Sequence, residues 1–390
     1  MAPLATFLTL GLAGLSSVAS AHPGHDVQKE AAERAAFMQS APLESRSLGH
    51  CTSKLKARGT EDLNIARRES AVHQLREARN LSTGARYLKA RDTDSVLATD
   101  HHSNLTGSFS HPGGTCIVQP EVTQGPYCKT HGSFIFGNKS NHINTDISGE
   151  LIRKEVAEDQ QGVPLFMDIQ LIDTNTCKPL PNVYADIWHC NATGVYSGVV
   201  QDGNGDTSDK GNINETFLRG VQRTNLDGIV QFASIFPGHY SGRATHIHVV
   251  THPANETRAL PNGTISGTYD SRSSHVGQIY FDQDLITEVE KTVPYSSNTQ
   301  ELTKNANDSL LPAEAETTDP LMEYVFLGDD ISDGVFAWIS IGIDGKRDVP
   351  VSPEVFWTED GGVVNDDFVM GTAGVPTEIL ASLAAQSTSA

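Results

Sequence analysis

The chain is poor in basic residues and, beyond its first 21 residues, has no long apolar run. Among 390 residues there are 28 Lys and Arg against 48 Asp and Glu, so the formal net charge is −20. Proteins that bind nucleic acids and other polyanions depend on basic surface, so this balance argues against such partners. No later stretch approaches the roughly 20 apolar residues that a membrane helix needs, and no internal repeat is present. We therefore expect a non-repetitive protein that spans no membrane and binds no nucleic acid.

Cysteine is also scarce, with five in the chain. An odd number leaves at least one thiol outside any internal pairing. Cys177 and Cys190 flank a predicted strand–turn–strand, and we expect them to form a disulfide. Cys116 and Cys128 could close a second loop, which would leave Cys51 over.

The N-terminus has the features of a secretory leader. The apolar segment Leu4–Val18 precedes Ala19–Ala21, an A-x-A cleavage motif, so residues 1–21 are predicted to be a signal peptide. The mature, secreted chain would then begin at His22. Eight Asn-x-Ser/Thr glycosylation motifs support an extracellular location, as does cysteine in an oxidising compartment. Their asparagines are Asn80, Asn104, Asn138, Asn191, Asn214, Asn255, Asn262 and Asn307.

Residues 22–115 differ in composition from the rest of the chain. Their first part is rich in Ala, Glu, Lys and Arg, and helix propensity predicts helices over Glu30–Met38 and Ile65–Arg79. Apolar positions are sparse, so these helices need a partner surface. Two interpretations stay open: a helical arm that packs on such a surface, or a solvated or removable leader. Residues 92–114 read as a polar linker in which His101 is expected to be solvated.

From residue 116 the apolar period changes to two, which is typical of strands. Several alternating runs separated by Gly, Pro and Asn turns predict a mainly β fold, an antiparallel or mixed β-sandwich over residues 116–370. A flexible tail would follow over 371–390. The positions expected on the buried faces are Leu165, Met167, Ile169, Leu171, Val183, Ala185, Ile187, Val335, Ala337, Ile339, Ile341 and Ile343.

A His-x-His pair lies in a β-branched run that predicts a strand. Side chains alternate along a strand, so His246 and His248 share a face about 7 Å apart at Cα, while Ile247 faces the core. Tyr240 follows a Pro-Gly turn that could bend the chain toward the same point. By itself such a pair is a weak metal motif, because satisfied core histidines also produce it.

Several motifs accompany this pair in a fixed order, and together they resemble the intradiol ring-cleavage dioxygenases, most closely their secreted fungal branch. The resemblance runs from about Cys116 to Phe356. It rests on the segments Pro120–Tyr127, Gly194–Ser197, Arg219–Gly228, Pro237–Tyr240 and Arg243–His248.

The resemblance implies a non-haem Fe(III) centre held by two tyrosines and two histidines. Tyr196 would stay bound, Tyr240 would be displaced by substrate, and His246 and His248 would complete the set. The residue types agree with that ion, since phenolate is a hard anion that favours a hard trivalent metal. A free tyrosine has a pKa near 10, so a strong Lewis acid is needed to deprotonate two of them.

The resemblance also implies the reaction and its remaining residues. The substrates would be a small catechol-type aromatic and O2, and the products cis,cis-muconate-type diacids. As in some members of the family, the helical arm within residues 22–115 would make homodimer contacts. Arg243 would stabilise negative charge that develops on the ring, Gln278 would lie near the ring, and Tyr240 would take a substrate proton. Tyr127 could line the pocket, although its sequence context fits a core tyrosine equally well.

Other readings of the sequence remain. Asp186 and Trp188 are expected to be strand residues near the site, and His189 to be structural. Cleavage after residue 21 would expose His22, which could chelate copper, although Pro23 follows it directly. A different class altogether would be a β-sandwich module that binds phenolics or glycans without catalysis.

Overall fold

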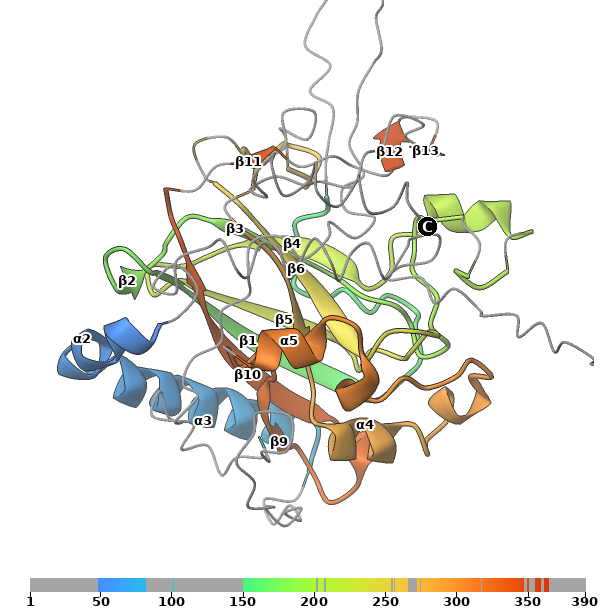
Figure 1. The fold of residues 1–390 in the computed structure, drawn as a ribbon, viewed down its shortest axis with the longest axis horizontal. Helices are drawn as coiled ribbons and strands as arrows, with labels where there is room; N and C mark the ends of the chain where they lie inside the picture. Colours follow the sequence, from blue (N-terminus) through green and yellow to red (C-terminus); the bar gives the residue numbers. More distant parts are fainter. Residues whose placement is uncertain are drawn as a thin grey trace, which may run out of the picture.

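The computed structural model describes residues 48–81, 101, 150–200, 203–206, 208–253, 255, 257–265, 272–273, 275–316, 318–346, 349–350, 355–358 and 361–364. Two β-sheets pack face to face in its centre, and helices lie outside them (Figure 1). This arrangement confirms the predicted mainly β fold with a mixed sandwich core and an N-terminal helical segment.

The first sheet is mixed and is built around β1 (Pro164–Asp173). β1 pairs in parallel with β10 (Val335–Ile343), although almost half of the chain separates them. Antiparallel partners complete the sheet: β5 (Ile229–Ile235) and β2 (Lys178–Pro179) on β1, and β9 (Glu323–Phe326) on β10.

The second sheet is antiparallel and has the order β4-β3-β6-β8. Its central strands are β3 (Tyr184–Trp188) and β6 (His246–His252), and its outer strands are β4 (Arg219–Arg223) and β8 (His275–Tyr280). Each strand packs one face on the first sheet, so its alternate side chains face away from the core.

The buried faces follow the predicted alternation. Leu165, Ile169 and Leu171 of β1 are fully buried in one apolar cluster with Ile187 and Ile247 of the second sheet. Burial of one such side chain contributes roughly 1.5–3 kcal/mol. The period-two pattern therefore fixes which face of each strand is left for polar side chains.

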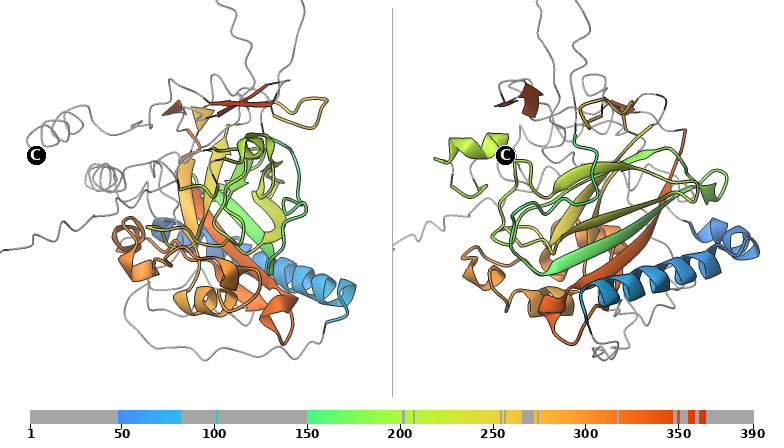
Figure 2. Two further views of the ribbon diagram at one scale, coloured as in Figure 1. Left: turned by 90° about the vertical axis from the view of Figure 1, so that its right-hand side faces the viewer. Right: turned by 180° about the vertical axis from the view of Figure 1, so that it is seen from behind.

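The remaining elements surround this sandwich. Figure 2 shows α4 (Gln283–Val289) and α5 (Leu311–Ala315) at one end. Two short strand pairs lie at the other end, β7 (Arg272–Ser273) with β11 (Val349–Pro350) and β12 (Val355–Thr358) with β13 (Gly361–Val364). Short 3-10 helices span Gly49–Cys51, Lys210–Asn214, Tyr295–Ser297, Asn305–Asn307 and Ile331–Asp333. None of the described helices is both long and apolar enough to cross a membrane.

Two N-terminal helices, α2 (Thr52–Ala57) and α3 (Thr60–Ala78), precede the sandwich, and α3 packs against the outer face of the first sheet (Figures 1 and 2). α3 begins five residues before the predicted helix over Ile65–Arg79. Its contact is largely polar, because Arg67 forms two hydrogen bonds to the buried carboxylate of Asp168 at 3.0 and 2.7 Å. The partner surface that the sparse apolar pattern required is thus the chain's own sheet. A dimer contact through this segment stays a prediction, and the helix expected over Glu30–Met38 lies outside the described residues.

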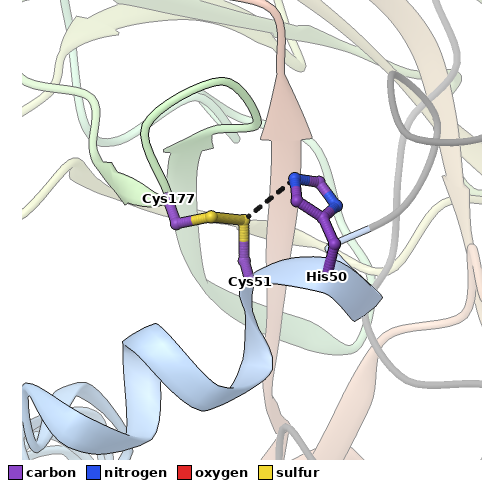
Figure 3. Close-up of side chains that lie close together, drawn as sticks. All are labelled: His50, Cys51 and Cys177. Atoms are coloured by element: carbon purple, nitrogen blue, oxygen red, sulfur yellow. Dashed lines mark hydrogen bonds between the residues drawn. A yellow bond between two sulfur atoms is a disulfide. The ribbon is translucent and has the colours of Figure 1, made fainter.

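The predicted disulfide between Cys177 and Cys190 is wrong. Cys177 bonds Cys51, 126 positions away (Figure 3). Cys190 is a buried free thiol. Strand spacing suggested the local pair, but α2 and the turn after β1 bring the distant cysteine closer. Cys116 and Cys128 lie outside the described residues.

Candidate metal centre

β6 presents His246 and His248 on the outer face of the second sheet. Ile247 is buried in the core between the sheets, so His246 and His248 point the other way. The register with the neighbouring strands places Trp188 beside His248 on one side and Gln278 on the other. A cluster of buried polar and aromatic side chains therefore forms on this face.

Four donor atoms meet on that face. The Nε2 atom of His246 lies 3.4 Å from the Tyr196 hydroxyl, 3.3 Å from the Tyr240 hydroxyl and 3.2 Å from Nε2 of His248. All four residues are at most 4 % exposed. The structure thus brings together the four residues that the resemblance implied as iron ligands.

Buried asparagines hold Tyr196 in place. Asn204 accepts a hydrogen bond from the Tyr196 amide at 2.7 Å and donates one to its carbonyl at 2.9 Å, and Asn212 donates to the same carbonyl at 2.8 Å. Because both backbone groups are satisfied, the loop can be buried without an orphaned polar group. No sequence pattern indicated this role, since asparagines are common in any polar loop.

A tight turn positions Tyr240. A Cβ added to Gly238 would lie 2.4 Å from the Asn191 carbonyl oxygen, so only glycine permits this approach to the loop that leads to Tyr196. Next to it, His239 contacts the Glu290 carboxylate at 2.8 Å and the Gln300 carbonyl at 3.0 Å. These contacts fasten the turn to α4 and to the segment that follows it.

Burial determines the protonation of Tyr196, His246 and His248. Burial lowers the pKa of His246 and of His248 to about 3, so both imidazoles are neutral near pH 7. The Nδ1 atom of His246 lies 2.6 Å from the Ala244 carbonyl and donates to it, which leaves a lone pair on Nε2. Burial, with the neighbouring Tyr240 next in effect, raises the pKa of Tyr196 well above its ordinary value, so its phenol keeps its proton unless a cation is near.

The donor set fits a hard trivalent cation. Ligand atoms about 2 Å from one ion are roughly 3 Å from each other, and the three distances at His246 fall at that spacing. Two phenolates supply anionic oxygen, and two neutral imidazoles add no charge. Tyr196, Tyr240, His246 and His248 could therefore hold ferric iron.

Arg243 and Gln278 lie beside this set. The Nη2 group of Arg243 donates to Oε1 of Gln278 and, at 3.0 Å, to the hydroxyl of Tyr280. The Tyr280 hydroxyl in turn donates to Gln278 at 2.6 Å. Register places Tyr280 opposite His246, a neighbour that the sequence analysis missed because the strand pairing was unknown. Tyr127 lies outside the described residues.

The expectation that His101 is solvated is wrong. Its side chain is 1 % exposed, and its ring nitrogens contact Asp282 at 2.5 Å and Asp319 at 3.1 Å. Burial lowers the pKa of His101, but the hydrogen bonds to the two carboxylates outweigh burial and raise it well above the ordinary value. Both partners are distant in sequence, so no local pattern could have revealed the contact.

The other residues considered near the site have separate roles in the structure. The ring of Trp188 packs edge-on against Tyr196, with centroids 4.9 Å apart. Asp186 is buried and lies 3.5 Å from His252. His189 contacts the Ser234 hydroxyl and the Cys190 carbonyl, both at 2.8 Å, which agrees with a structural residue.

A second group of metal-type side chains has a simpler explanation. His50, Cys51 and Cys177 place their donor atoms within 4.8 Å of one another. Figure 3 shows that the two sulfurs are bonded to each other, and Nε2 of His50 lies 2.8 Å from the Thr174 carbonyl. Since a disulfide has no thiolate to donate, this group is a structural crosslink.

Comparison with known proteins shows what the chain is similar to. A family model described as "Dioxygenase" matches residues 136–320. These residues contain both tyrosines and both histidines of the candidate centre, as well as Arg243 and Gln278. No curated protein matches the chain significantly.

Solved structures show the same kind of similarity. An intradiol ring-cleavage dioxygenase from Tetranychus urticae is 28% identical, covers 60% of this chain and 97% of its own, and has a TM-score of 0.43. The dioxygenase domain of a carbohydrate-binding fusion protein from Streptomyces sp. SirexAA-E is 22% identical, with coverages of 53% and 96% and a TM-score of 0.30. Catechol 1,2-dioxygenase from Pseudomonas arvilla C-1 is 18% identical, with coverages of 48% and 55% and a TM-score of 0.28.

The family match contains the complete set of two tyrosines and two histidines that converge on one point. The chain is therefore similar to dioxygenases over slightly less than half of its length, and this part holds the whole candidate centre.

Proposed function

We propose that this chain is a secreted, non-haem Fe(III) dioxygenase that cleaves catechol-type aromatics between their two hydroxyl-bearing carbons. The observation that carries the proposal is the meeting of two phenols and two neutral imidazoles at distances of 3.2 to 3.4 Å. Both atoms of O2 enter the product, a cis,cis-muconate-type diacid. When bound, ferric iron supplies Lewis acidity and withdraws electron density from the ring.

The protein side chains bind, orient and exchange protons. Tyr196, His246 and His248 stay in place as ligands, and their burial excludes water from the centre. Tyr240 leaves its position when the catechol binds, and its phenolate oxygen accepts a proton from a substrate hydroxyl. Neutral imidazoles suit this exchange because they neither release nor take up protons near pH 7.

Two residues face the substrate ring beside the centre. Arg243 is fully buried and supplies a positive charge next to the position where negative charge develops on the ring. Gln278 is also fully buried, and its Nε2 group has no acceptor among the described residues. An unsatisfied buried donor is costly, so a substrate oxygen at this position would gain a hydrogen bond at little further cost.

The decisive experiment is visible absorption spectroscopy of the purified protein, before and after catechol is added without oxygen. We expect a broad tyrosinate-to-iron band that moves to longer wavelength with catechol, and release of a muconate-type product once oxygen is admitted. A protein that stays colourless after ferric loading and does not turn over catechol would contradict the proposal.

A matched pair of variants tests the ligand assignment. Tyr196→Phe removes one phenolate, so we expect at least about a 10-fold weaker affinity for iron, as even outer contacts of a metal site contribute that much. Tyr184→Phe is the control. Tyr184 is also a buried tyrosine, but it lies at the start of β3, opposite His252 and apart from the centre. Equal iron content in the two variants would show that Tyr196 is no ligand.

Secretion rests on the leader over residues 1–21 and the eight glycosylation motifs. Expression of the full chain in a eukaryotic secretory host, followed by N-terminal sequencing of the medium, tests it. We expect a mature chain that starts at His22. Retention inside the cell with an intact N-terminus would contradict secretion.

A further inference from the structure

Asp308 is a fully buried carboxylate that the four-ligand set does not use. It lies in the irregular segment between α4 and β9, directly after the 3-10 helix Asn305–Asn307. One oxygen accepts hydrogen bonds from Nε of Arg243 at 2.9 Å and from the Ala244 amide at 2.7 Å. The other accepts the Leu310 and Leu311 amides, both at 2.8 Å. Four donors thus hold the carboxylate in one orientation.

The segment that carries Asp308 is itself anchored to the second sheet. The side chain of Asn305 donates to the Phe281 carbonyl at 2.8 Å. The backbone N–H of Asn305 donates to the side chain of Gln283 at 2.8 Å. Both partners follow directly after β8, the strand of Gln278. Asp308 therefore has a defined position relative to the residues beside the metal centre.

The ion pair determines which way Arg243 points. Asp308 binds the guanidinium at Nε, so the Nη2 end lies toward β8, where it contacts Gln278 and Tyr280. Both charges of the pair are 0 % exposed. A buried guanidinium cannot exchange its protein partners for water. Because Asp308 holds the Nε edge of Arg243, the Nη2 group is directed at the site.

We propose that Asp308 is the positioning residue of Arg243: it keeps the guanidinium fixed beside Gln278 and Tyr280, at the edge of the site where the substrate ring reacts. The inference rests on the proposed function, since Arg243 acts on charge that develops during ring cleavage. It assigns a role in catalysis to the segment between α4 and β9, which contributes no ligand to the metal set.

The same carboxylate also supports the backbone that leads to the ligands. Asp308 accepts from the Ala244 amide, and the Ala244 carbonyl accepts from Nδ1 of His246. A variant could therefore disturb the metal ligand as well as Arg243. Iron content and the visible band separate the two effects, because loss of Arg243 orientation alone leaves both unchanged.

The test is a double-mutant cycle between Asp308→Asn and Arg243→Ala, measured as kcat and KM for catechol on iron-loaded protein. We expect Asp308→Asn to keep its iron and its band and to lose about 10²-fold in kcat, as a displaced catalytic group does, with KM little changed. In the Arg243→Ala background, Asp308→Asn should lower kcat by less than about threefold, because the effects of substitutions at coupled residues are not additive.

Control variants make each outcome either support or contradict the role of Asp308. Asp330→Asn replaces an exposed aspartate that caps a 3-10 turn, and it should leave kcat unchanged. If Asp308→Asn does not fold, Asp308→Glu keeps the charge on a longer side chain and enters the same cycle. Losses that multiply in the double variant, or a full rate in Asp308→Asn, would overturn the inference. A wild-type protein without colour or turnover would instead overturn the proposed function and this role with it.

Discussion

Buried histidines in this protein differ in charge according to their partners. His189 has a pKa lowered to about 4 and His246 and His248 to about 3, because burial removes hydration and no carboxylate compensates for it. His239 and His101 are also buried, but each contacts at least one carboxylate, and the pKa of each is raised above its ordinary value. Among these five histidines, a carboxylate contact distinguishes those with a raised pKa from those with a lowered pKa.

The charged link at His101 makes the stability of the protein depend on pH. The folded-state pKa of His101 is raised, so its contribution is complete below the unfolded pKa of about 6.5 and is lost as pH rises through the folded value. We expect the free energy of unfolding of wild type to exceed that of His101→Gln most near pH 6. The difference should shrink as the pH is raised into the alkaline range.

Denaturant unfolding of both proteins from pH 6 to pH 10 measures this difference. His73→Gln is the control, because His73 on α3 is 66 % exposed and its contact with Glu77 lies at the surface. A constant difference between wild type and His101→Gln across this range would show that His101 is not a buried cation.

At the scale of elements, α3 packs on the first sheet through charged as well as apolar contacts. Asp168 on the outer face of β1 receives Arg67 at 2.7 Å and lies 3.7 Å from the buried Arg68. Burial lowers the pKa of Arg68 to about 10 in spite of this carboxylate. A helix with so polar a contact depends on one particular sheet surface, since an unpaired buried charge is strongly unfavourable.

The disulfide between Cys51 and Cys177 ties α2 to the turn after β1. Replacement of both cysteines by serine should lower the free energy of unfolding by about 2–5 kcal/mol, because a crosslink across a long loop restricts the unfolded chain. Thermal unfolding of wild type and the double variant measures this change.

Peptide mapping without reductant checks the pairing itself. We expect Cys51 and Cys177 in one crosslinked peptide, and Cys190 to react with an alkylating reagent only after unfolding, since it is 1 % exposed. A peptide that joins Cys177 to Cys190 would contradict the structure.

At the scale of the whole molecule, the sandwich separates stability from chemistry. One face of the second sheet packs in the apolar core, and its opposite face carries His246, His248 and Gln278. The loops to Tyr196 and Tyr240 and the segment with Asp308 meet over this outer face. The site is thus assembled from distant segments on a rigid surface, which is how a fold holds a metal centre in fixed geometry.

This arrangement predicts that iron stabilises the fold as a whole. A cation that binds only the folded chain at about 100 times its dissociation constant adds about 2.7 kcal/mol, which for a domain of this size raises the melting temperature by roughly 5–10 °C. Thermal unfolding before and after removal of iron with a chelator measures the shift. Tyr196→Phe is the control, and its melting temperature should respond less to the chelator. An equal response would argue against the tyrosine as a ligand.

Much of the fold, and the shared face of two ligand candidates, could be predicted from local pattern. Period-two alternation identified the buried faces of β1, β3 and β10, and the His-x-His spacing placed two ligand candidates on one face of β6. These predictions hold because a strand exposes alternate residues whatever its partners are. Residues 116–149, with Tyr127, lie largely outside the described part of the chain, so the predictions about them stay untested.

The contacts that cross the chain could not be predicted in this way. The sequence determined which residues are apolar, which alternate, and which can donate to a metal, because those are properties of single side chains and of backbone period. Only the tertiary structure decided that Cys51 pairs with Cys177, that Asp282 and Asp319 bury His101, and that Asp308 directs Arg243. The physical reason is that each of these contacts joins segments about 65 to 220 positions apart. Their proximity arises from sheet packing and register, and no local pattern encodes it.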